Sequence, residues 1–343
     1  MMDAIELAIL AGVSFAAATL LTFRLRAYAV AQGMMDRPNE RSSHVVKTPR
    51  GGGAAIVIVT LLSLAYIGWS GAAPWRLCAV MGGGGLLVAL VGWVDDRRGL
   101  PASTRFLAHL AASVAVTYEI GFVRELPLGA ATLPLGWVGF VISVLGVAWL
   151  INLTNFMDGI DGIAASQAAF VLPASLFLAG TRDGAMSVGL ATAAAACGFL
   201  VLNWPPAKIF MGDVGSGFLG YMVGVMMLMG ARSDPAAGIW PFVILSSTFV
   251  VDSTVTLVRR MATGQKWSQP HRSHAYQHGA QRWGHRAVTL AFLGVNLAWV
   301  LPIAVLARAY PAAGFGLALF CMLPLIGVAL RMRAGLAQTG VER

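Results

Sequence analysis

Long apolar runs alternate with short polar segments along the whole chain. Apolar runs of roughly 17 to 25 residues have the length that a helix needs to cross the hydrocarbon of a bilayer. The pattern predicts an all-α, polytopic integral membrane protein with about 11 transmembrane helices. These lie near residues 4–23, 52–70, 77–94, 105–120, 137–151, 162–180, 185–202, 215–231, 239–258, 288–307 and 312–330.

Lysine and arginine residues sort onto one side of this predicted topology. When the gaps between runs are assigned alternately to two sides, 19 of the 24 cations fall on one of them. Cytoplasmic segments carry the excess of Lys and Arg, so we expect a periplasmic N-terminus and a cytoplasmic C-terminus. The net charge of +9 is confined to short segments between spans, which indicates a lipid bilayer and no nucleic acid as partner.

The polar clusters of the chain fall on the same predicted cytoplasmic side. They occupy loops near 24–51, 95–104, 152–161, 203–214 and 259–287. Five loops that converge on one face suggest one site, and we treat residues 1–343 as a single transmembrane catalytic domain. The sequence is 57% hydrophobic and 11% charged, so acidic residues at the ends of membrane runs are costly unless they are functional, paired or solvated.

Five carboxylates stand at such ends: Asp95, Asp96, Asp158, Asp161 and Asp213. In "NLTNFMDGIDG" the polar positions Asn152, Asn155, Asp158 and Asp161 recur every third residue, and such a row drifts by about 60° per step around a helix. A regular helix could not aim all four inward. Gly159 and Gly162 permit the backbone to break, so we expect a helix end that lines a cavity.

Carboxylate and amide oxygens of this kind suit Mg²⁺, with Mn²⁺ as the alternative ion. Mg²⁺ commonly takes one or two protein oxygens and completes its shell with water and substrate phosphates. In "FMGDVGSG", glycines surround Asp213 at the start of a span, where backbone N–H groups could face an anion. The same glycines would also suit a tight turn into a packed helix.

The basic loops suggest anion contacts. His271, Arg272 and His274 lie in a gap of about thirty residues, long for a connection that covers no site. Zinc is the rival interpretation, but no Cys lies nearby. Lys47 and Arg50 precede "GGG" and predict either a phosphate-contact surface or topology signals alone. Asp252 either lines the site or makes a structural polar contact.

Together the segments "PRGGG", "VDDRRGL", "NLTNFMDGIDGIAA", "NWPPAKIFMGDVGS" and "HRSHAYQ" resemble the polyprenyl-phosphate N-acetylhexosamine-1-phosphate transferase family (glycosyltransferase family 4). The resemblance covers about residues 36 to 285. It implies transfer of a sugar 1-phosphate from a UDP-N-acetylhexosamine to undecaprenyl or another polyprenyl phosphate, with UMP as the second product and Mg²⁺ as cofactor. It also implies a multi-pass protein of the bacterial inner (plasma) membrane, with its site on the cytoplasmic face.

The resemblance assigns roles to individual positions. Asn155 and Asp213 match metal-contacting positions, and Asp95 and Asp96 match an acidic pair that acts as base or orients the lipid phosphate. Asp158 and Asp161 match carboxylates of the nucleotide site, and His271, Arg272 and His274 match a loop beside the diphosphate. Lys47, Arg50, Asn152 and Lys208 are the expected substrate-binding residues.

Two departures limit the assignment. Gly99 stands where some N-acetylglucosamine-1-phosphate transferases continue the acidic pair with a further Asp. The segment "HRSHAYQ" lacks the consecutive histidines of the phospho-N-acetylmuramoyl-pentapeptide translocase. The pattern is more similar to the O-antigen branch. That translocase remains an alternative, as does, from another class, an ion-coupled membrane transporter. The sequence fixes neither the sugar nor the oligomeric state, and a homodimer is compatible with it.

Overall fold

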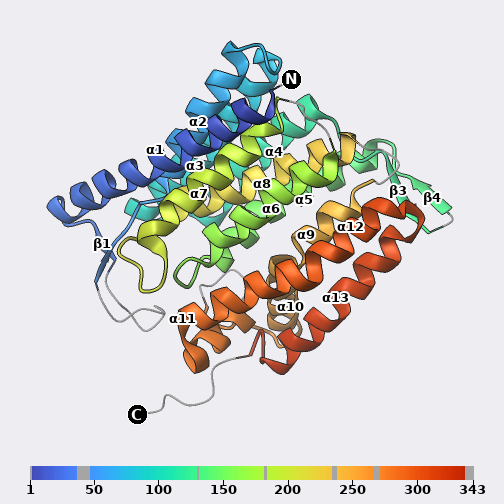
Figure 1. Cartoon of the computed structure of the whole chain (residues 1–343). Helices are drawn as coiled ribbons and strands as arrows, with labels where there is room; N and C mark the ends of the chain where they lie inside the picture. The colour runs from blue at the N-terminus through green and yellow to red at the C-terminus, as the bar shows by residue number, and fades with distance from the viewer. Residues whose placement is uncertain are drawn as a thin grey trace.

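The computed structural model describes residues 2–36, 47–129, 131–180, 184–233, 238–265 and 271–336, and it is predominantly helical (Figure 1). Residues 37–46 and 266–270 of the predicted site loops lie outside the described residues. The helices are α1 (Ala4–Ala31), α2 (Ala54–Trp69), α3 (Trp75–Arg98), α4 (Ala102–Ile120), α5 (Trp137–Met157), α6 (Ile163–Ala179), α7 (Ser187–Asn203), α8 (Asp213–Ser233), α9 (Trp240–Leu245), α10 (Ser247–Ala262), α11 (Ala275–Val295), η1 (Asn296–Val300), α12 (Leu301–Ala309), η2 (Pro311–Ala313) and α13 (Gly314–Arg331).

The predicted apolar runs coincide with helices, and the multi-pass character of the chain is confirmed. Six helical segments of the described chain are long and apolar enough to cross a membrane: α1, α3, α5, α8, residues 275–309 and residues 311–331. Shorter apolar helices are α2, α6 and α7. The count of eleven crossings and the orientation of the termini stay predictions.

Two helices differ from the predicted runs. The ninth run is one helix in the prediction, but the structure divides it into α9 and α10 at Ser246. The tenth run begins earlier, because α11 starts at Ala275 and continues across a kink at Gly284, where φ is 80° and ψ is 161°. Glycine permits this left-handed backbone, and the kink separates a short polar segment from the apolar part of the helix.

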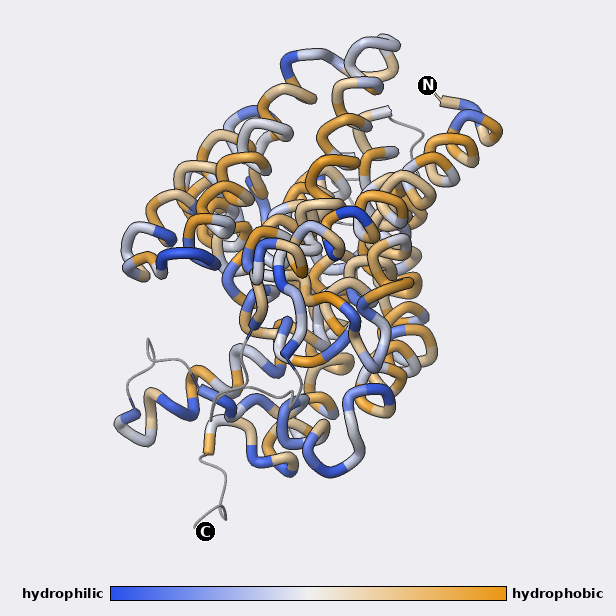
Figure 2. Tube along the Cα trace, turned by 90° about the vertical axis from the view of Figure 1, so that its left-hand side faces the viewer, coloured by the Kyte–Doolittle hydropathy of each residue, from blue (hydrophilic) through white to orange (hydrophobic). Residues whose placement is uncertain are grey.

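Helix α8 forms the centre of the bundle and packs against α3, α5 and α6. Its residues from Val214 to Gly230 are buried almost without interruption. Gly220 allows α5 to approach closely, because a Cβ there would collide with the carbonyl oxygen of Leu150 and lie 2.8 Å from Cα of Ile151. Small residues at helix contacts are typical of packing in lipid. Figure 2 shows hydrophobic residues along most of the helices.

Two short antiparallel sheets add to the all-α prediction, one at each end of the bundle (Figure 1). Strands β1 (Met35–Asp36) and β2 (Thr48–Pro49) pair through Met35 with Pro49 and Asp36 with Thr48. At the opposite end, β3 (Glu125–Leu128) and β4 (Ala131–Pro134) form a hairpin. The loops after α5 and α7 lie at the same end of the bundle as the first sheet (Figure 1).

The segment after β2 is joined to the loop before α8 by backbone hydrogen bonds. Phe210 N donates to Pro49 O at 2.8 Å, and Gly53 N donates to Met211 O at 2.9 Å. A Cβ on Gly53 would lie 2.5 Å from Cα of Gly215, so only glycine permits this approach. The contact brings "PRGGG" and "FMGDVGSG" together, although about 160 residues separate them in the sequence.

Candidate active site

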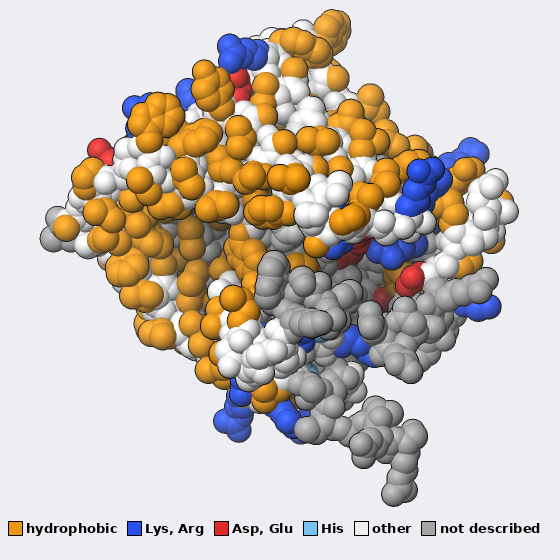
Figure 3. Space-filling view, turned by 180° about the vertical axis from the view of Figure 1, so that it is seen from behind, with side chains coloured by type: hydrophobic (Ala, Val, Ile, Leu, Met, Phe, Trp, Pro, Cys, Tyr) orange, Lys and Arg blue, Asp and Glu red, His pale blue; other side chains and the backbone are white. Residues whose placement is uncertain are grey.

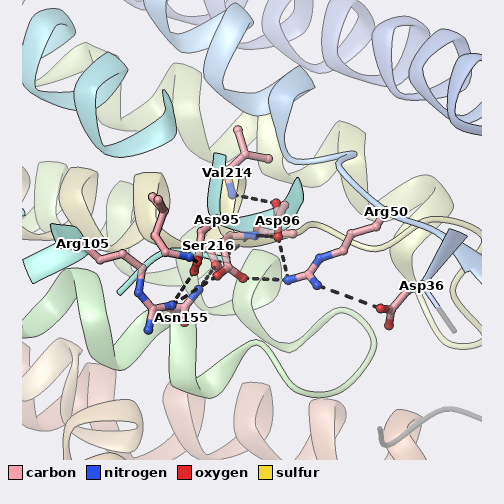
Figure 4. A network of polar contacts seen from close by, with 11 residues as sticks. Asp36, Arg50, Asp95, Asp96, Arg105, Asn155, Val214 and Ser216 are labelled. Atoms are coloured by element: carbon pink, nitrogen blue, oxygen red, sulfur yellow. Dashed lines mark hydrogen bonds and ion pairs between the residues drawn. The ribbon is translucent and has the colours of Figure 1, made fainter. Parts of the chain in front are cut away.

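Arg50 connects two of the predicted site carboxylates. Its Nη2 lies 2.7 Å from Oδ1 of Asp96 and 2.8 Å from Oδ1 of Asp213, while Nη1 lies 4.0 Å from Oδ1 of Asp36. Figure 4 shows its guanidinium group between Asp96 and Asp36. The neighbouring carboxylates raise the pKa of Arg50 against the opposing effect of burial. Arg50 therefore lies among the predicted site carboxylates, and its contact with a substrate phosphate stays a prediction.

Asp96 holds the start of α8 in place. Its Oδ1 accepts a hydrogen bond from Asp213 N at 3.0 Å, and its Oδ2 accepts one from Val214 N at 3.3 Å. These N–H groups belong to the first turn of α8, where backbone N–H groups find no acceptor within the helix itself. Gly212 has φ of 76°, and a Cβ there would lie 2.6 Å from Oδ2 of Asp96. The glycine before Asp213 thus allows the carboxylate to reach the helix end.

Asp95 points to a different partner, Arg105 of α4. Its carboxylate accepts hydrogen bonds from the Arg105 guanidinium and from the backbone N–H of Leu100. Arg105 Nη1 also lies 3.9 Å from Oδ2 of Asp213. Sequence reasoning missed Arg105 as a site residue, although a lone cation in an apolar run is a usable signal.

Asn155 and Asn152, one turn apart on α5, make different contacts. Asn155 Nδ2 donates to Ser216 Oγ at 3.0 Å, which places it against the first turns of α8. Asn152 Nδ2 donates to Ala148 O of its own helix at 2.7 Å. Asn155 therefore joins the group around Asp213, and Asn152 is tied to its own helix. Ser216 is a further site neighbour that the sequence pattern alone did not indicate.

Asp158 and Asp161 occupy different surroundings just after α5. Burial raises the pKa of Asp158 well above its ordinary value, and the carboxylates of Asp213, Asp96 and Asp161 add to this effect. Asp161 instead accepts a hydrogen bond from Ala207 N at 3.0 Å, and its Oδ1 lies 3.3 Å from Nδ1 of His285. Asp158 therefore belongs to the charged site, while Asp161 fixes the loop after α7.

We call Asp36, Asp95, Asp96, Asp158, Asp213, Arg50 and Arg105 the acidic cluster. Its five carboxylates outnumber its two guanidinium groups, and Figure 3 shows acidic and basic side chains in a hollow of the apolar surface. Within the described ranges, no group of three or more His, Cys, Asp or Glu side chains is arranged to hold a metal ion. Mg²⁺ commonly needs only one or two protein ligands, and an oxygen-rich site with an excess of negative charge fits it.

A second group of polar side chains, His271, Ser273, His274, Asp252 and Tyr276, forms what we call the histidine cluster. The rings of His271 and His274 stack with centroids 5.0 Å apart, and Ser273 Oγ lies 3.0 Å from Nδ1 of His271. Burial and the nearby His274 and Arg260 lower the pKa of His271 to about 3. His271 is therefore neutral at physiological pH, and Arg272 is half-buried beside it.

The histidine cluster meets the acidic cluster through the end of α5. Tyr276 Oη donates to the carbonyl oxygen of Phe156 at 2.8 Å, and the rings of Phe156 and His274 lie 6.4 Å apart. Phe156 follows Asn155 directly in the chain. The structure thus brings His274 beside the segment that carries Asn155 and Asp158.

The two predicted substrate-binding lysines lie outside both clusters. Lys47 and Lys208 are exposed, and the Lys208 carbonyl accepts a hydrogen bond from Arg26 Nε at 3.2 Å. Their predicted contacts with substrate stay predictions.

These features define a helical multi-pass membrane protein with an arginine-bridged acidic site next to a histidine-containing loop. The chain matches the sequence model of glycosyl transferase family 4 over residues 78–231. It is 31% identical over 270 residues to a probable undecaprenyl-phosphate N-acetylglucosaminyl 1-phosphate transferase of Bacillus subtilis, which covers 77% of this chain and 74% of that protein. The chain belongs to glycosyl transferase family 4.

Two further relatives represent two named activities. A decaprenyl-phosphate N-acetylglucosaminephosphotransferase of Mycolicibacterium smegmatis is 33% identical over 314 residues, with 80% of this chain and 75% of that protein covered. A phospho-N-acetylmuramoyl-pentapeptide-transferase of a Synechococcus species is 32% identical over 248 residues, with 66% and 65% covered. The family resemblance seen in the sequence is confirmed.

Proposed function

We propose that the chain transfers a sugar 1-phosphate from a UDP-N-acetylhexosamine to undecaprenyl phosphate or another polyprenyl phosphate. The products are a polyprenyl diphosphosugar and UMP, and the reaction begins an O-antigen or another cell-envelope glycan. The observation that carries the proposal is Arg50 bridging Asp96 and Asp213 within a cluster that has an excess of carboxylates. Such a site suits two phosphates and a divalent cation, and the names of the relatives supply the substrate class.

The reaction is an in-line displacement at the sugar-linked phosphorus. An oxygen of the lipid phosphate forms the new P–O bond, and the bond to the UMP oxygen breaks with its electron pair. The second pKa of a phosphate ester is about 6, so the attacking phosphate is largely ionised and needs no strong base. The principal task is to hold two anions in line, which depends on positioning and on cationic groups.

The residues of the chain divide this task. Asn155 and Asp213 would hold Mg²⁺, since the Asn155 amide donates through Nδ2 to Ser216 and leaves its oxygen as the atom that can bind a cation. When bound, the ion supplies Lewis-acid polarisation of the diphosphate. Arg50 and Arg105 offset phosphate charge.

The contacts of Asp95 and Asp96 support a role in orienting Arg50 and Arg105 more than a role in abstracting a proton. Both carboxylates already accept hydrogen bonds from arginine and backbone N–H groups. His271, Arg272 and His274 would approach the diphosphate from the other side.

We further propose that the site lies at the cytoplasmic boundary of the inner membrane, because one substrate is anchored in lipid and the other is soluble. This placement agrees with the eleven crossings, the periplasmic N-terminus and the cytoplasmic C-terminus expected from the cation distribution. Labelling of cysteines introduced at either end of the chain with membrane-impermeant reagents tests the orientation of the termini.

The activity is tested with the purified chain in detergent, undecaprenyl phosphate and a panel of UDP-N-acetylhexosamines. We expect UMP release that requires Mg²⁺ or Mn²⁺ and a lipid product whose mass identifies the sugar. Full activity in excess chelator would refute the metal role. A sugar-nucleotide-dependent covalent phospho-enzyme would refute direct displacement.

UDP-N-acetylmuramoyl-pentapeptide is the matched competitor in this panel, because one relative bears that activity in its name. Preference for this donor would replace the main proposal by the translocase alternative. The ion-coupled transporter is not favoured, since the family and the named relatives are transferases.

A further inference from the structure

Asp252 of α10 is a buried carboxylate that the proposed displacement does not use. It is 3% exposed, and the side chain accepts four hydrogen bonds. Oδ1 accepts from Nδ1 of His274 at 3.2 Å, from Ala275 N at 3.0 Å and from Thr256 Oγ1 at 3.2 Å. Oδ2 accepts from Tyr276 N at 2.9 Å. Three of these four donors come from consecutive residues at the start of α11.

The contact with His274 determines which ring nitrogen is available. A carboxylate only accepts hydrogen bonds, so Nδ1 of His274 carries the proton that it shares with Asp252. Nε2 is then the ring nitrogen left to meet a substrate, and the partner of Nδ1 commonly sets the tautomer and orientation of a histidine in this way. Phe156, His271 and Tyr276 pack around the same ring, which limits its rotation.

The contact with Tyr276 extends to the end of α5. Asp252 fixes the backbone of Tyr276, and the hydroxyl of that residue donates to the carbonyl oxygen of Phe156 at 2.8 Å. A Cβ on Gly159 would collide with the same hydroxyl. The start of α11 is therefore held in register with the segment that carries Asn155.

We propose that Asp252 is a positioning residue that fixes the start of α11 against the end of α5 and thereby aims Nε2 of His274 at the diphosphate. This inference rests on the proposed transferase function. A helix start needs only hydrogen-bond acceptors, which neutral side chains supply. Using a buried carboxylate as that acceptor costs more than using a neutral side chain. The negative charge of Asp252 also stabilises the ring of His274 where it meets a phosphate. Among the charged and titratable groups near Asp252 and His274 are Arg260, His271 and His278.

The test is a double-mutant cycle of Asp252→Asn and His274→Gln, with UMP release as the assay. Because loss of an orienting partner typically costs roughly 10- to 100-fold in activity, we expect kcat of Asp252→Asn to fall by that factor. KM for the UDP-sugar should change much less. If Asp252 acts through His274, the double variant should be no slower than His274→Gln alone. Glu119→Gln, whose carboxylate pairs with Arg76 at the opposite end of α3 and α4, is the matched control and should leave turnover unchanged.

Two results would overturn the assignment: wild-type kcat in Asp252→Asn, or losses that multiply in the double variant. Multiplied losses would mean that Asp252 acts as a helix cap independent of His274. If Asp252→Asn does not fold in detergent, the same cycle with Asp252→Glu keeps the charge but displaces the acceptor, and the same outcomes decide. A wild-type chain that releases no UMP from any UDP-N-acetylhexosamine would overturn the proposed function itself, which separates the two failures.

Discussion

The acidic cluster and the histidine cluster lie at the same end of the molecule but are built in opposite ways. The acidic cluster gathers its side chains from β1, from the residue after β2, from α3, α4 and α8, and from the end of α5. Its carboxylates exceed its cations. The histidine cluster draws on residues 271–276 and on Asp252 of α10, and this single carboxylate is matched by four hydrogen-bond donors.

This difference assigns a physical role to each region. Burial raises the pKa of Asp158, and repulsion by the neighbouring carboxylates raises it further. A cation or a cationic partner would relieve that repulsion. The histidine cluster is satisfied by its own contacts and gains little from an added ion. We therefore expect the acidic cluster to respond to Mg²⁺ and the histidine cluster to govern geometry.

The largest expected effect comes from Asp213, the carboxylate shared by Arg50 and the proposed metal. In Asp213→Asn we expect turnover to fall by at least about 100-fold, because metal polarisation is worth several kcal/mol and each 1.36 kcal/mol is tenfold in rate. UMP release across a Mg²⁺ titration is the measurement. A variant that keeps wild-type turnover and the wild-type Mg²⁺ midpoint would exclude Asp213 as a ligand.

Replacing Arg50 separates charge from phosphate contact. Arg50→Gln removes a cation that lies 2.7 Å from Asp96 and 2.8 Å from Asp213. The site becomes more negative, so Mg²⁺ should bind more tightly while turnover falls, by roughly 10-fold or more, because a charge-assisted hydrogen bond is lost. Arg50→Lys keeps the charge without the planar fork and should recover only part of the turnover. A weaker Mg²⁺ midpoint in Arg50→Gln would contradict this account.

The same contrast explains what the sequence could predict. Membrane runs, the shared side of the polar loops and the identity of the carboxylates follow from hydropathy and residue type, so the multi-pass helical fold and the positions of Asp95, Asp96 and Asp213 were accessible. The sequence could not reveal that Asp96 accepts backbone hydrogen bonds from α8. That contact depends on the approach of two helices that are more than 100 residues apart in the chain.

Other differences have equally local causes. Asp158 and Asp161 have the same spacing and chemistry in the sequence, but Asp161 meets Ala207 and His285 only after the loops have packed. The break between α9 and α10 at Ser246 interrupts an apolar run without a proline or glycine at that point, so hydropathy predicts one helix there.

Asp158→Asn and Asp161→Asn should lower turnover alike and change stability in opposite directions. Between the ordinary and the raised pKa of Asp158 the native state binds more protons than the unfolded state, so stability falls as pH rises through that window. Asp158→Asn should therefore unfold at a higher temperature than the wild type at neutral pH without Mg²⁺. This gain should vanish near pH 4, about the ordinary pKa of Asp.

Asp161→Asn should instead be less stable by about 1–3 kcal/mol, because it disturbs a partly buried acceptor of the Ala207 N–H. Thermal unfolding in detergent at two pH values measures both variants. Equal destabilisation of the two would show that Asp158 is held by structural contacts, which would remove it from the acidic cluster.

The smallest expected effect on chemistry comes from the glycine that lets α3 approach the start of α8. A Cβ on Gly92 would collide with the carbonyl oxygen of Asp213 and lie 2.7 Å from Val214 N. Overpacking of this kind typically costs about 1–3 kcal/mol, so Gly92→Ala should lower the unfolding temperature and reduce turnover a few-fold by displacing Asp213. Gly83 of the same helix is exposed, and nothing lies within 4 Å of an added Cβ. Gly83→Ala should therefore keep full turnover and match or exceed wild-type stability, since alanine favours helix more than glycine does. If both substitutions have the same effect on turnover, the close approach of α3 to α8 does not position the acidic cluster.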